Sequence, residues 1–190
     1  MADIQRVVTG KVRLSFVNVF KPRPPMNGQQ GDPKYSVTVL LPKSDTVTKA
    51  KLDAAVEAAA QEGVHKKWQG KRPPKLSVPI HDGDGVRENG DPFGPECKGC
   101  WVFTASSKDQ PGIVDAACEA IMNQSDVYSG CYGRVSFRAY PYDAAGKRGI
   151  GFGLGNVQKL EDGEPLAAGQ VSADRDFGSE IDPITGEPKA

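Results

Sequence analysis

The chain has 190 residues, 38% of them hydrophobic, with 22 glycines, 15 prolines and a formal net charge of zero. This length suits one domain with short appendages, and the glycine and proline content favours short strands and turns over a helical bundle, so we expect a mainly β protein. No stretch approaches the roughly 18 apolar residues of a membrane span, and the N-terminus lacks the apolar segment of a secretory signal, so we expect a cytoplasmic protein without membrane partners.

Charge is divided unevenly along the chain. Residues 1–160 hold 22 Lys and Arg against 16 Asp and Glu, whereas residues 161–190 hold 2 against 8. The body therefore carries +6 and the C-terminal part carries −6. A basic body attracts a polyanion, and an acidic tail repels that polyanion or competes with it for the same surface.

The sequence predicts two strands near the N-terminus. Residues 9–20 are rich in β-branched and aromatic side chains and predict the first, which should end at the proline-rich run 21–25 because proline cannot continue a ladder. Residues 34–41 alternate in polarity and predict its hairpin partner. The connection between the two strands carries the cations Lys21, Arg23 and Lys34.

A helix is predicted over residues 47–62. Ser44 or Asp45 can cap its first amides, and Gly63 is the expected stop. Its apolar positions recur at helical spacing, so it should pack against the sheet. Residues 64–99 lose all periodicity and predict a long irregular insertion, which in a compact domain is usually functional.

Alternation returns in the second half of the chain. Residues 101–107 predict a third strand, residues 111–126 a turn or short helix, and residues 131–142 the strongest strand. Residues 150–160 predict the last strand, in which Ile150, Phe152 and Leu154 alternate with Gly149, Gly151, Gly153 and Gly155. We therefore expect one domain over 1–160, followed by an acidic tail over 161–190 that has too few large apolar residues to fold alone.

One face of the strand 131–142 combines aromatic rings with guanidinium groups: Tyr132, Arg134, Arg138, Tyr140 and Tyr142. Rings can stack on bases while cations neutralise phosphates, which is how sheets bind single-stranded nucleic acid. The glycine stripe of the next strand could form the floor of such a groove. The alternative is a structural or protein-interaction module, because Tyr and Arg also pack at protein interfaces and glycines also relieve curvature in a small barrel.

Catalytic and metal-binding motifs are weak. The clustered carboxylates in residues 81–85 could hold Mg²⁺, but Asp-Gly pairs form turns, and the strands supply no further carboxylates. There is no Walker loop, HExxH or nucleophile motif, so we expect no enzyme and no cofactor. The four cysteines are expected to be free thiols. Cys97 and Cys100 form a lone CxxC, which leaves structural zinc open as a minor alternative.

Five blocks of the sequence follow one another as GKVRLSFVNVFKP at 10–22, KYSVTVLLPKSD at 34–45, PIHDGD at 79–84, YSGCYGRVSFRAYPYD at 128–143 and GIGFGLGNVQKLEDGEPL at 149–166. Together they resemble the phage-type single-stranded DNA-binding proteins of the Enc34 family. The resemblance implies an OB-fold, five-stranded barrel and a role in phage DNA replication, recombination or repair. It also implies an acidic tail that tempers DNA binding and docks replication or recombination proteins. The chain departs from typical bacterial single-strand binders by ending in GEPKA, so Phe177 is the internal docking candidate.

We therefore predict binding of single-stranded DNA without strong sequence preference, and weaker binding of double-stranded DNA through charge. The candidate stacking residues are Phe20, Tyr35, Trp101, Tyr132, Tyr140 and Tyr142. The candidate phosphate-binding residues are Lys11, Arg13, Lys21, Arg23, Lys34, Arg134, Arg138, Lys147 and Arg148.

Overall fold

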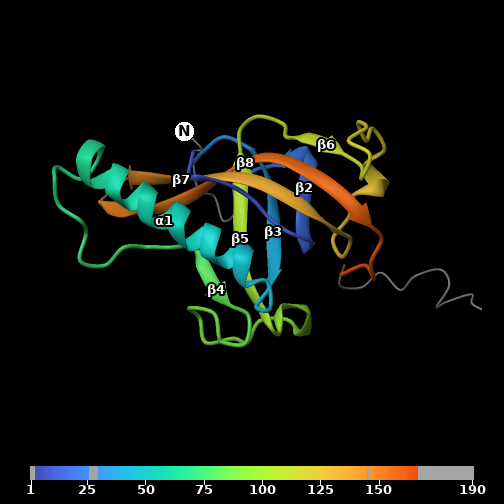
Figure 1. The fold of residues 1–190 in the computed structure, drawn as a ribbon, viewed down its shortest axis with the longest axis horizontal. Helices are drawn as coiled ribbons and strands as arrows, with labels where there is room; N and C mark the ends of the chain where they lie inside the picture. The colour runs from blue at the N-terminus through green and yellow to red at the C-terminus, as the bar shows by residue number, and fades with distance from the viewer. Residues whose placement is uncertain (1–2, 26–29, 145, 167–190) are drawn as a thin grey trace, which may run out of the picture.

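The computed structural model describes residues 3–25, 30–144 and 146–166. Within them, eight strands and one long helix follow in the order β1 (Arg6–Val8), β2 (Val12–Arg23), β3 (Lys34–Pro42), α1 (Thr46–Lys66), β4 (Ile80–Asp82), β5 (Cys100–Ser107), β6 (Gly112–Val114), β7 (Tyr132–Ala144) and β8 (Lys147–Glu161). Two 3-10 turns, η1 (Pro95–Cys97) and η2 (Gln124–Asp126), lie in the connections. The longest strands, β7 and β8, form a hairpin that crosses the molecule (Figure 1).

Five of the strands close into a barrel. β7 pairs with β2, β2 with β3, β3 with β5, β5 with β8, and β8 with β7 again. The β5–β8 pairing is parallel and runs through Ser106 and Gly153, whereas the other four are antiparallel. A closed five-stranded barrel of this kind is an OB fold, so the predicted fold class is confirmed.

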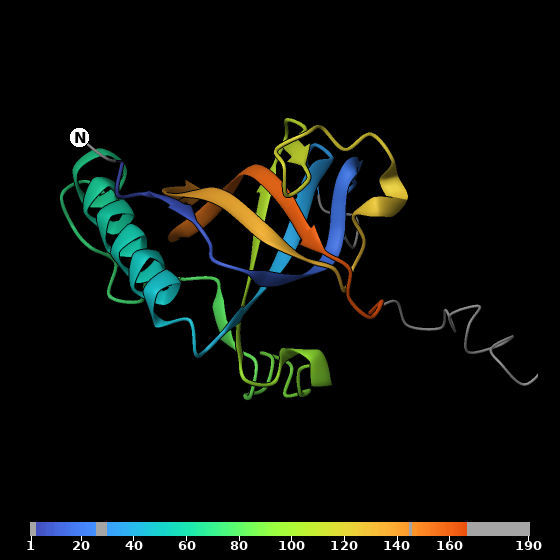
Figure 2. The same ribbon diagram turned by 45° about the vertical axis from the view of Figure 1, so that its right-hand side comes forward.

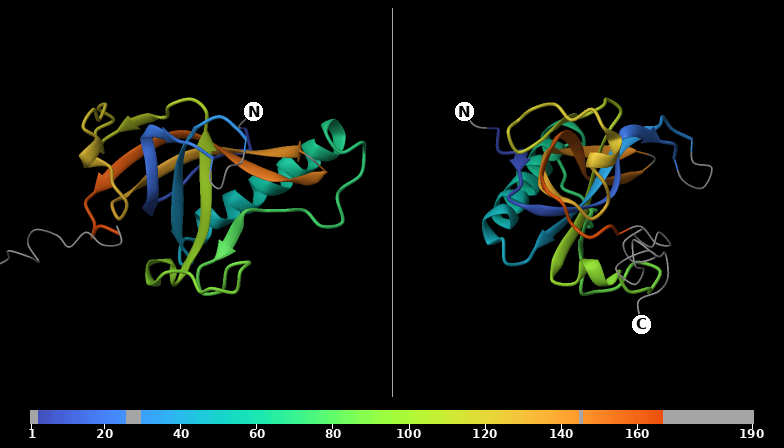
Figure 3. Two further views of the ribbon diagram at one scale, coloured as in Figure 1. Left: turned by 180° about the vertical axis from the view of Figure 1, so that it is seen from behind. Right: turned by 90° about the vertical axis from the view of Figure 1, so that its right-hand side faces the viewer.

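The helix lies beside the end of the β7–β8 hairpin (Figure 2). The left-hand view of Figure 3 shows that β6 and the connection to β7 lie at the opposite end of the molecule from α1. The edge strand β1 pairs with β7 through Val7 and Phe137. No helix among the described residues is long and apolar enough to cross a lipid bilayer.

Aromatic rings fill the barrel interior. Phe103, Phe137 and Phe152 meet pairwise edge to face, with ring centroids 5.2–5.4 Å apart, a favourable geometry for such rings. Val37 and Val39 are fully buried on the core side of β3, as the alternation in residues 34–41 predicts. The alternation predicted for residues 131–142 also holds, because every second residue from Cys131 to Ala139 is buried.

β2 is longer than predicted, because it includes Pro22 and ends at Arg23. The strand still ends within the proline-rich run 21–25, as predicted, but three residues later than the expected end at Phe20. Only β3 pairs with this part of β2, since the β7 pairing is confined to Val12 and Arg13. A strand segment with one unpaired edge tolerates proline, because the missing N–H removes no ladder bond there.

α1 is capped as predicted but ends later. The Asp45 carboxylate accepts hydrogen bonds from the Thr48 hydroxyl at 2.6 Å and the Thr48 backbone N–H at 2.9 Å, and these two bonds, the hydroxyl one first, lower the pKa of Asp45. The helix continues through Gly63 to Lys66, so His65 lies in its last turn and not in the irregular insertion.

Gly63 serves packing and does not end the helix. A Cβ at this position would stand 2.7 Å from the Trp68 ring and 2.8 Å from the Cβ of Pro141 in β7. The glycine therefore lets α1 approach the hairpin closely. The Trp68 ring is fully buried, and its Nε1–H donates to the Tyr142 carbonyl at 3.1 Å.

The predicted insertion over residues 64–99 is thus partly ordered by the barrel. It contains the end of α1, the buried Trp68 and strand β4, which pairs with β5 from Ile80 to Asp82. The region 111–126, expected to be a turn or short helix, contains β6, which pairs in parallel with β8, and the 3-10 turn η2. These short strands carry too few residues for a visible period in the sequence.

Candidate nucleic-acid interface

The Tyr and Arg residues of β7 lie on the surface of the barrel. Arg134, Arg138 and Tyr140 are exposed, and Tyr132 and Tyr142 are half-buried. They alternate with the buried residues of the same strand, so their side chains point away from the core. Because β7 has 13 residues, Tyr132 and Tyr142 lie at opposite ends of it and contribute to two different parts of the surface.

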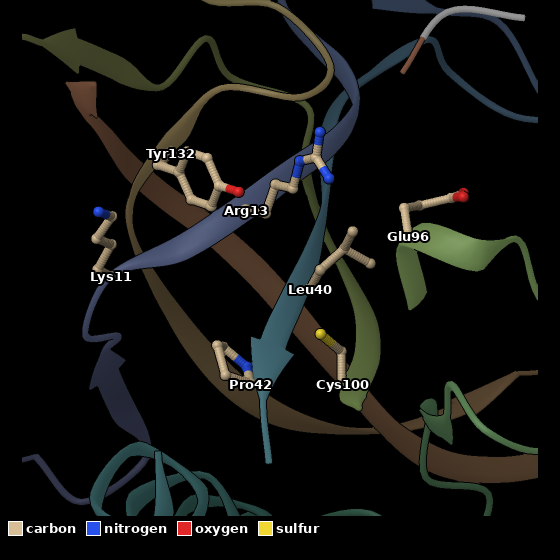
Figure 4. A pocket seen from close by; sticks show the side chains of 7 residues that line it. All are labelled: Lys11, Arg13, Leu40, Pro42, Glu96, Cys100 and Tyr132. Atoms are coloured by element: carbon tan, nitrogen blue, oxygen red, sulfur yellow. The ribbon is translucent and has the colours of Figure 1, made fainter. Parts of the chain in front are cut away.

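Tyr132 lines a hollow of about 290 Å³, which we call the Tyr132 pocket. The Lys11 ammonium and the Arg13 guanidinium lie 5.1 and 5.6 Å from the centre of its ring. Figure 4 shows both cations and the ring around one opening, with Leu40 and Cys100 below them. The pocket therefore combines an aromatic wall, two cations and an apolar floor. Its lining residues are Lys11, Arg13, Leu40, Pro42, Glu96, Cys100 and Tyr132.

Tyr140 and Tyr142 lie across the glycines of β8. A Cβ on Gly151 would stand 2.5 Å from the Tyr140 ring, and one on Gly149 would stand 2.7 Å from the Tyr142 hydroxyl. The prediction that the glycine stripe stays clear as a groove floor is therefore wrong at Gly149 and Gly151. The two rings occupy that space, and the missing side chains make room for them. Tyr140 keeps 39% of its surface exposed, while burial raises the pKa of its hydroxyl.

The cations beside these rings form surface ion pairs. Arg138 pairs with Asp3, and the Arg148 Nε donates to the Asp143 carboxylate at 2.9 Å. Lys11 pairs with Glu161 in the same way. Exposed pairs of this kind contribute little to stability, so these cations can exchange their carboxylates for phosphates at small cost.

A patch of small polar residues connects the two aromatic parts. Ser15, Thr38 and Thr104 are register partners across β2, β3 and β5, and Ser36, Ser106 and Gly153 are register partners across β3, β5 and β8. All alternate with core residues and therefore point away from the core, and Ser15 and Thr38 are only 5% and 9% exposed. We call these six residues the small-residue floor. It adjoins Tyr140, whose ring atoms lie 3.8 Å from a Cβ built on Gly153.

Sequence reasoning missed the small-residue floor. The alternation that places Val37, Val39 and Ala105 in the core also places Ser36, Thr38, Thr104 and Ser106 on the opposite face of the sheet. That signal was present in both strands. The signal does not by itself indicate a site, because small hydroxyl side chains are common on any solvent-facing strand.

The other predicted residues are more scattered. Lys21, Arg23, Lys34 and Tyr35 lie at the end of the β2–β3 hairpin, where Arg23 faces Lys34 in the register. Lys147 lies at the start of β8, Arg134 donates to the Thr9 carbonyl at 3.0 Å, and Phe20 packs against the core.

Trp101 is separate from the outward face. It pairs with the buried Leu41 and packs against the main core, with the ammonium groups of Lys43 and Lys49 at 5.1 and 4.8 Å from its ring centre. These contacts place the Trp101 ring beside the first turn of α1, away from the small-residue floor.

The carboxylates of Asp82 and Asp84 connect their loop to neighbouring segments of the chain through ion pairs and hydrogen bonds. Lys43 donates to Asp82 and Asp84 at 2.6 Å each, and its ammonium lowers the pKa of both carboxyls. Asp84 also accepts from the Gly99 N–H at 3.0 Å. In the described part of the chain, no group of three or more His, Cys, Asp or Glu side chains is placed to hold a metal ion.

The four cysteines are free thiols, as predicted. Cys97 and Cys131 are buried, Cys100 is half-buried and Cys118 is exposed. Burial is the main cause that raises the pKa of the Cys97 and Cys100 thiols, so both favour the protonated form.

The closed barrel with its cationic and aromatic outward face defines an OB-fold protein with a candidate polyanion-binding surface. The chain belongs to the family described as Enterobacter phage Enc34, ssDNA-binding protein, whose model matches residues 5–185. A curated relative, putative protein p50 of Acyrthosiphon pisum secondary endosymbiont phage 1, is 29% identical over 182 residues, which is 90% of this chain and 92% of the relative.

Two solved structures are similar in fold. The single-stranded DNA-binding protein of bacteriophage Enc34 in complex with single-stranded DNA superposes with a TM-score of 0.73 at 27% identity, covering 86% of this chain and 90% of that one. The single-stranded DNA-binding protein gp2.5 of bacteriophage T7 superposes with a TM-score of 0.58 at 14% identity, covering 90% and 99%. The second likeness concerns the fold alone.

Proposed function

We propose that this chain binds single-stranded DNA, without strong sequence preference, on the outward face of its barrel. The observation that carries the proposal is the grouping of exposed rings and cations around the small-residue floor, in a fold that matches an Enc34 complex with single-stranded DNA. Family membership supports a role in phage DNA replication, recombination or repair. The family's phage members also support a phage origin, which would place this protein in the cytoplasm of the host cell.

The chemistry of this face suits an unpaired strand. Tyr132 and Tyr140 offer ring faces on which bases stack, and every base has a π face, so such contacts tolerate any sequence. Lys11, Arg13 and Arg138 offer cations for phosphates. The small-residue floor between the rings leaves room for a backbone to pass close to the sheet. The face binds and holds a strand, and the proposal includes no catalytic step.

The double substitution Arg138→Ala, Tyr140→Ala tests the proposal. We expect binding of an oligo(dT) strand to weaken about 30-fold or more, because one stacked base contributes about 2 kcal/mol and a phosphate contact is lost as well. Fluorescence anisotropy of a labelled oligonucleotide measures the effect. Neither side chain belongs to the core, so the fold should persist.

Lys51→Ala, at an exposed position of α1, is the matched charge control and should bind like the wild type. The alternative is that this face is a protein interface. Size-exclusion chromatography tests it by measuring whether the double variant changes oligomeric state. If the double variant changes oligomeric state and keeps its DNA affinity, the face serves protein contacts and the proposal is wrong.

Deletion of residues 167–190 should tighten DNA binding. These residues carry five Asp and Glu against two Lys and Arg, so their removal takes away a competing polyanion. They lie outside the described residues, but the segment before them contacts residues of the Tyr132 pocket. The Arg13 guanidinium donates to the Glu164 carbonyl at 2.7 Å, and Leu166 packs against the cluster that contains Leu40.

The measurement is oligo(dT) affinity at low salt, where the charge effect is largest. A full-length variant with the five tail carboxylates changed to Asn and Gln should tighten binding in the same direction. Weaker binding by the truncated chain would show that the tail assists DNA instead of competing with it. The proposed docking of replication proteins through Phe177 also concerns residues outside those described.

A further inference from the structure

Phe16 stands out because it is an exposed aromatic residue inside a barrel strand. Its side chain is 60% exposed, whereas the rings of Phe103, Phe137 and Phe152 are buried in the core. A strict period of two would place Phe16 on the core side of β2 together with Val12 and Leu14. The structure turns it outward instead.

A β-bulge causes this reversal. Ser15 pairs with Thr38 and Asn18 pairs with Ser36, so three steps on β2 correspond to two steps on β3. The extra residue shifts the alternation by one, which is how bulges redirect a side chain. Phe16 adopts a φ of +45°, in the left-handed region that is unfavourable for bulky residues.

Two hydrogen bonds hold the bulge on either side. The Asn18 side-chain amide donates to the Phe16 carbonyl at 3.0 Å, and the Val17 N–H donates to the Ser129 hydroxyl at 3.2 Å. The strained conformation is therefore maintained by its surroundings. Such strain gathers at functional sites, where its cost is offset by the rest of the fold. Here the strain does not bury the ring but presents it to solvent.

The surroundings of Phe16 point to its ligand. It directly follows Ser15, the first residue of the small-residue floor, and it lies on the same strand as Arg13 of the Tyr132 pocket. We propose that Phe16 is a stacking residue for an unpaired nucleobase, placed by the bulge at the β2 edge of the small-residue floor, between its Ser15 row and its Ser36 row. This inference rests on the proposed function and adds a contact that no sequence pattern indicated.

The test replaces the ring while keeping the backbone conformation. Asn tolerates the left-handed region, so Phe16→Asn removes the ring without adding strain. We expect it to bind oligo(dT) about 5-fold to 150-fold more weakly than the wild type, the range for one stacked base. An abasic oligonucleotide of equal length has no base to stack, so both proteins should bind it equally. Val47 is an apolar residue of α1 that is about as exposed as Phe16, so Val47→Asn is the matched control. It should change neither the affinity for oligo(dT) nor that for the abasic strand.

A second variant keeps the test informative if Phe16→Asn folds poorly. Phe16→Trp retains a stacking ring and should keep wild-type affinity, and its added fluorescence should be quenched by oligo(dT) but not by the abasic strand. The thermal unfolding midpoint of Phe16→Asn should not fall below that of the wild type, because the ring is not part of the core.

Each failure has a distinct meaning. If the wild type does not bind oligo(dT), the proposed function itself fails. If the wild type binds and Phe16→Asn binds equally well, or loses affinity for the abasic strand to the same extent, the stacking role is wrong. If Phe16→Asn binds DNA more tightly in the full chain but not after deletion of 167–190, the ring holds the tail, and the inference is overturned in favour of that occupant.

Discussion

Affinity for oligo(dT) is expected to fall about 100-fold between roughly 50 and 200 mM monovalent salt. Each neutralised phosphate on a single strand contributes a slope of about 0.7 in log affinity against log salt, and about five contacts give this loss. The outward face offers that number, since Lys11, Arg13 and Arg138 flank the aromatic residues and Arg148 and Lys147 lie further along the hairpin. The measurement is a series of binding isotherms at increasing salt.

Charge variants assign the slope to particular side chains. Arg138→Gln should reduce it by about 0.7, the contribution of one phosphate, whereas Lys51→Gln on α1 should leave it unchanged. An affinity that stays constant over this salt range would remove the electrostatic half of the proposed function. Stacking alone would then have to account for binding.

Substitution of Trp68 is expected to cause the largest loss of stability. Trp68→Ala should lower the free energy of unfolding by about 3–5 kcal/mol, because it leaves a cavity in a site that is fully closed. The ring packs against Gly63 at the end of α1, and its Nε1–H donates to the Tyr142 carbonyl. Its loss separates the helix from the hairpin that carries Tyr140. Urea titration followed by circular dichroism measures the change.

Two further variants, Trp68→Phe and Val47→Ala, show what causes the loss of stability. Trp68→Phe keeps most of the apolar volume but loses the hydrogen bond, so it should cost less than Trp68→Ala. Val47 is exposed on α1, so the free energy of unfolding of Val47→Ala should stay within about 0.5 kcal/mol of the wild-type value. An unfolding midpoint of Trp68→Ala equal to that of the wild type would mean that the helix and hairpin are held together by other contacts.

Much of the barrel could be predicted from local patterns. The main strands, the helix and its Asp45 cap, and the inward and outward faces of β3 and β7 follow from polarity at period two or from capping chemistry. These are properties of neighbouring residues, so the sequence records them directly. The grouping of Lys11, Arg13 and Tyr132 around one pocket depended on the pairing of β2 with β7, which no local pattern specifies.

By itself, the sequence determined which side chains of each regular strand face the core and where cations and rings are available. The tertiary structure alone decided that Phe16 turns outward at a bulge, that Tyr140 covers Gly151, and that Trp101 joins the core side. Trp68, in a stretch without periodicity, became the buried link between helix and hairpin. The physical reason is that a period of two describes one strand, whereas bulges, ring placement and closure depend on partners brought together only when the barrel closes.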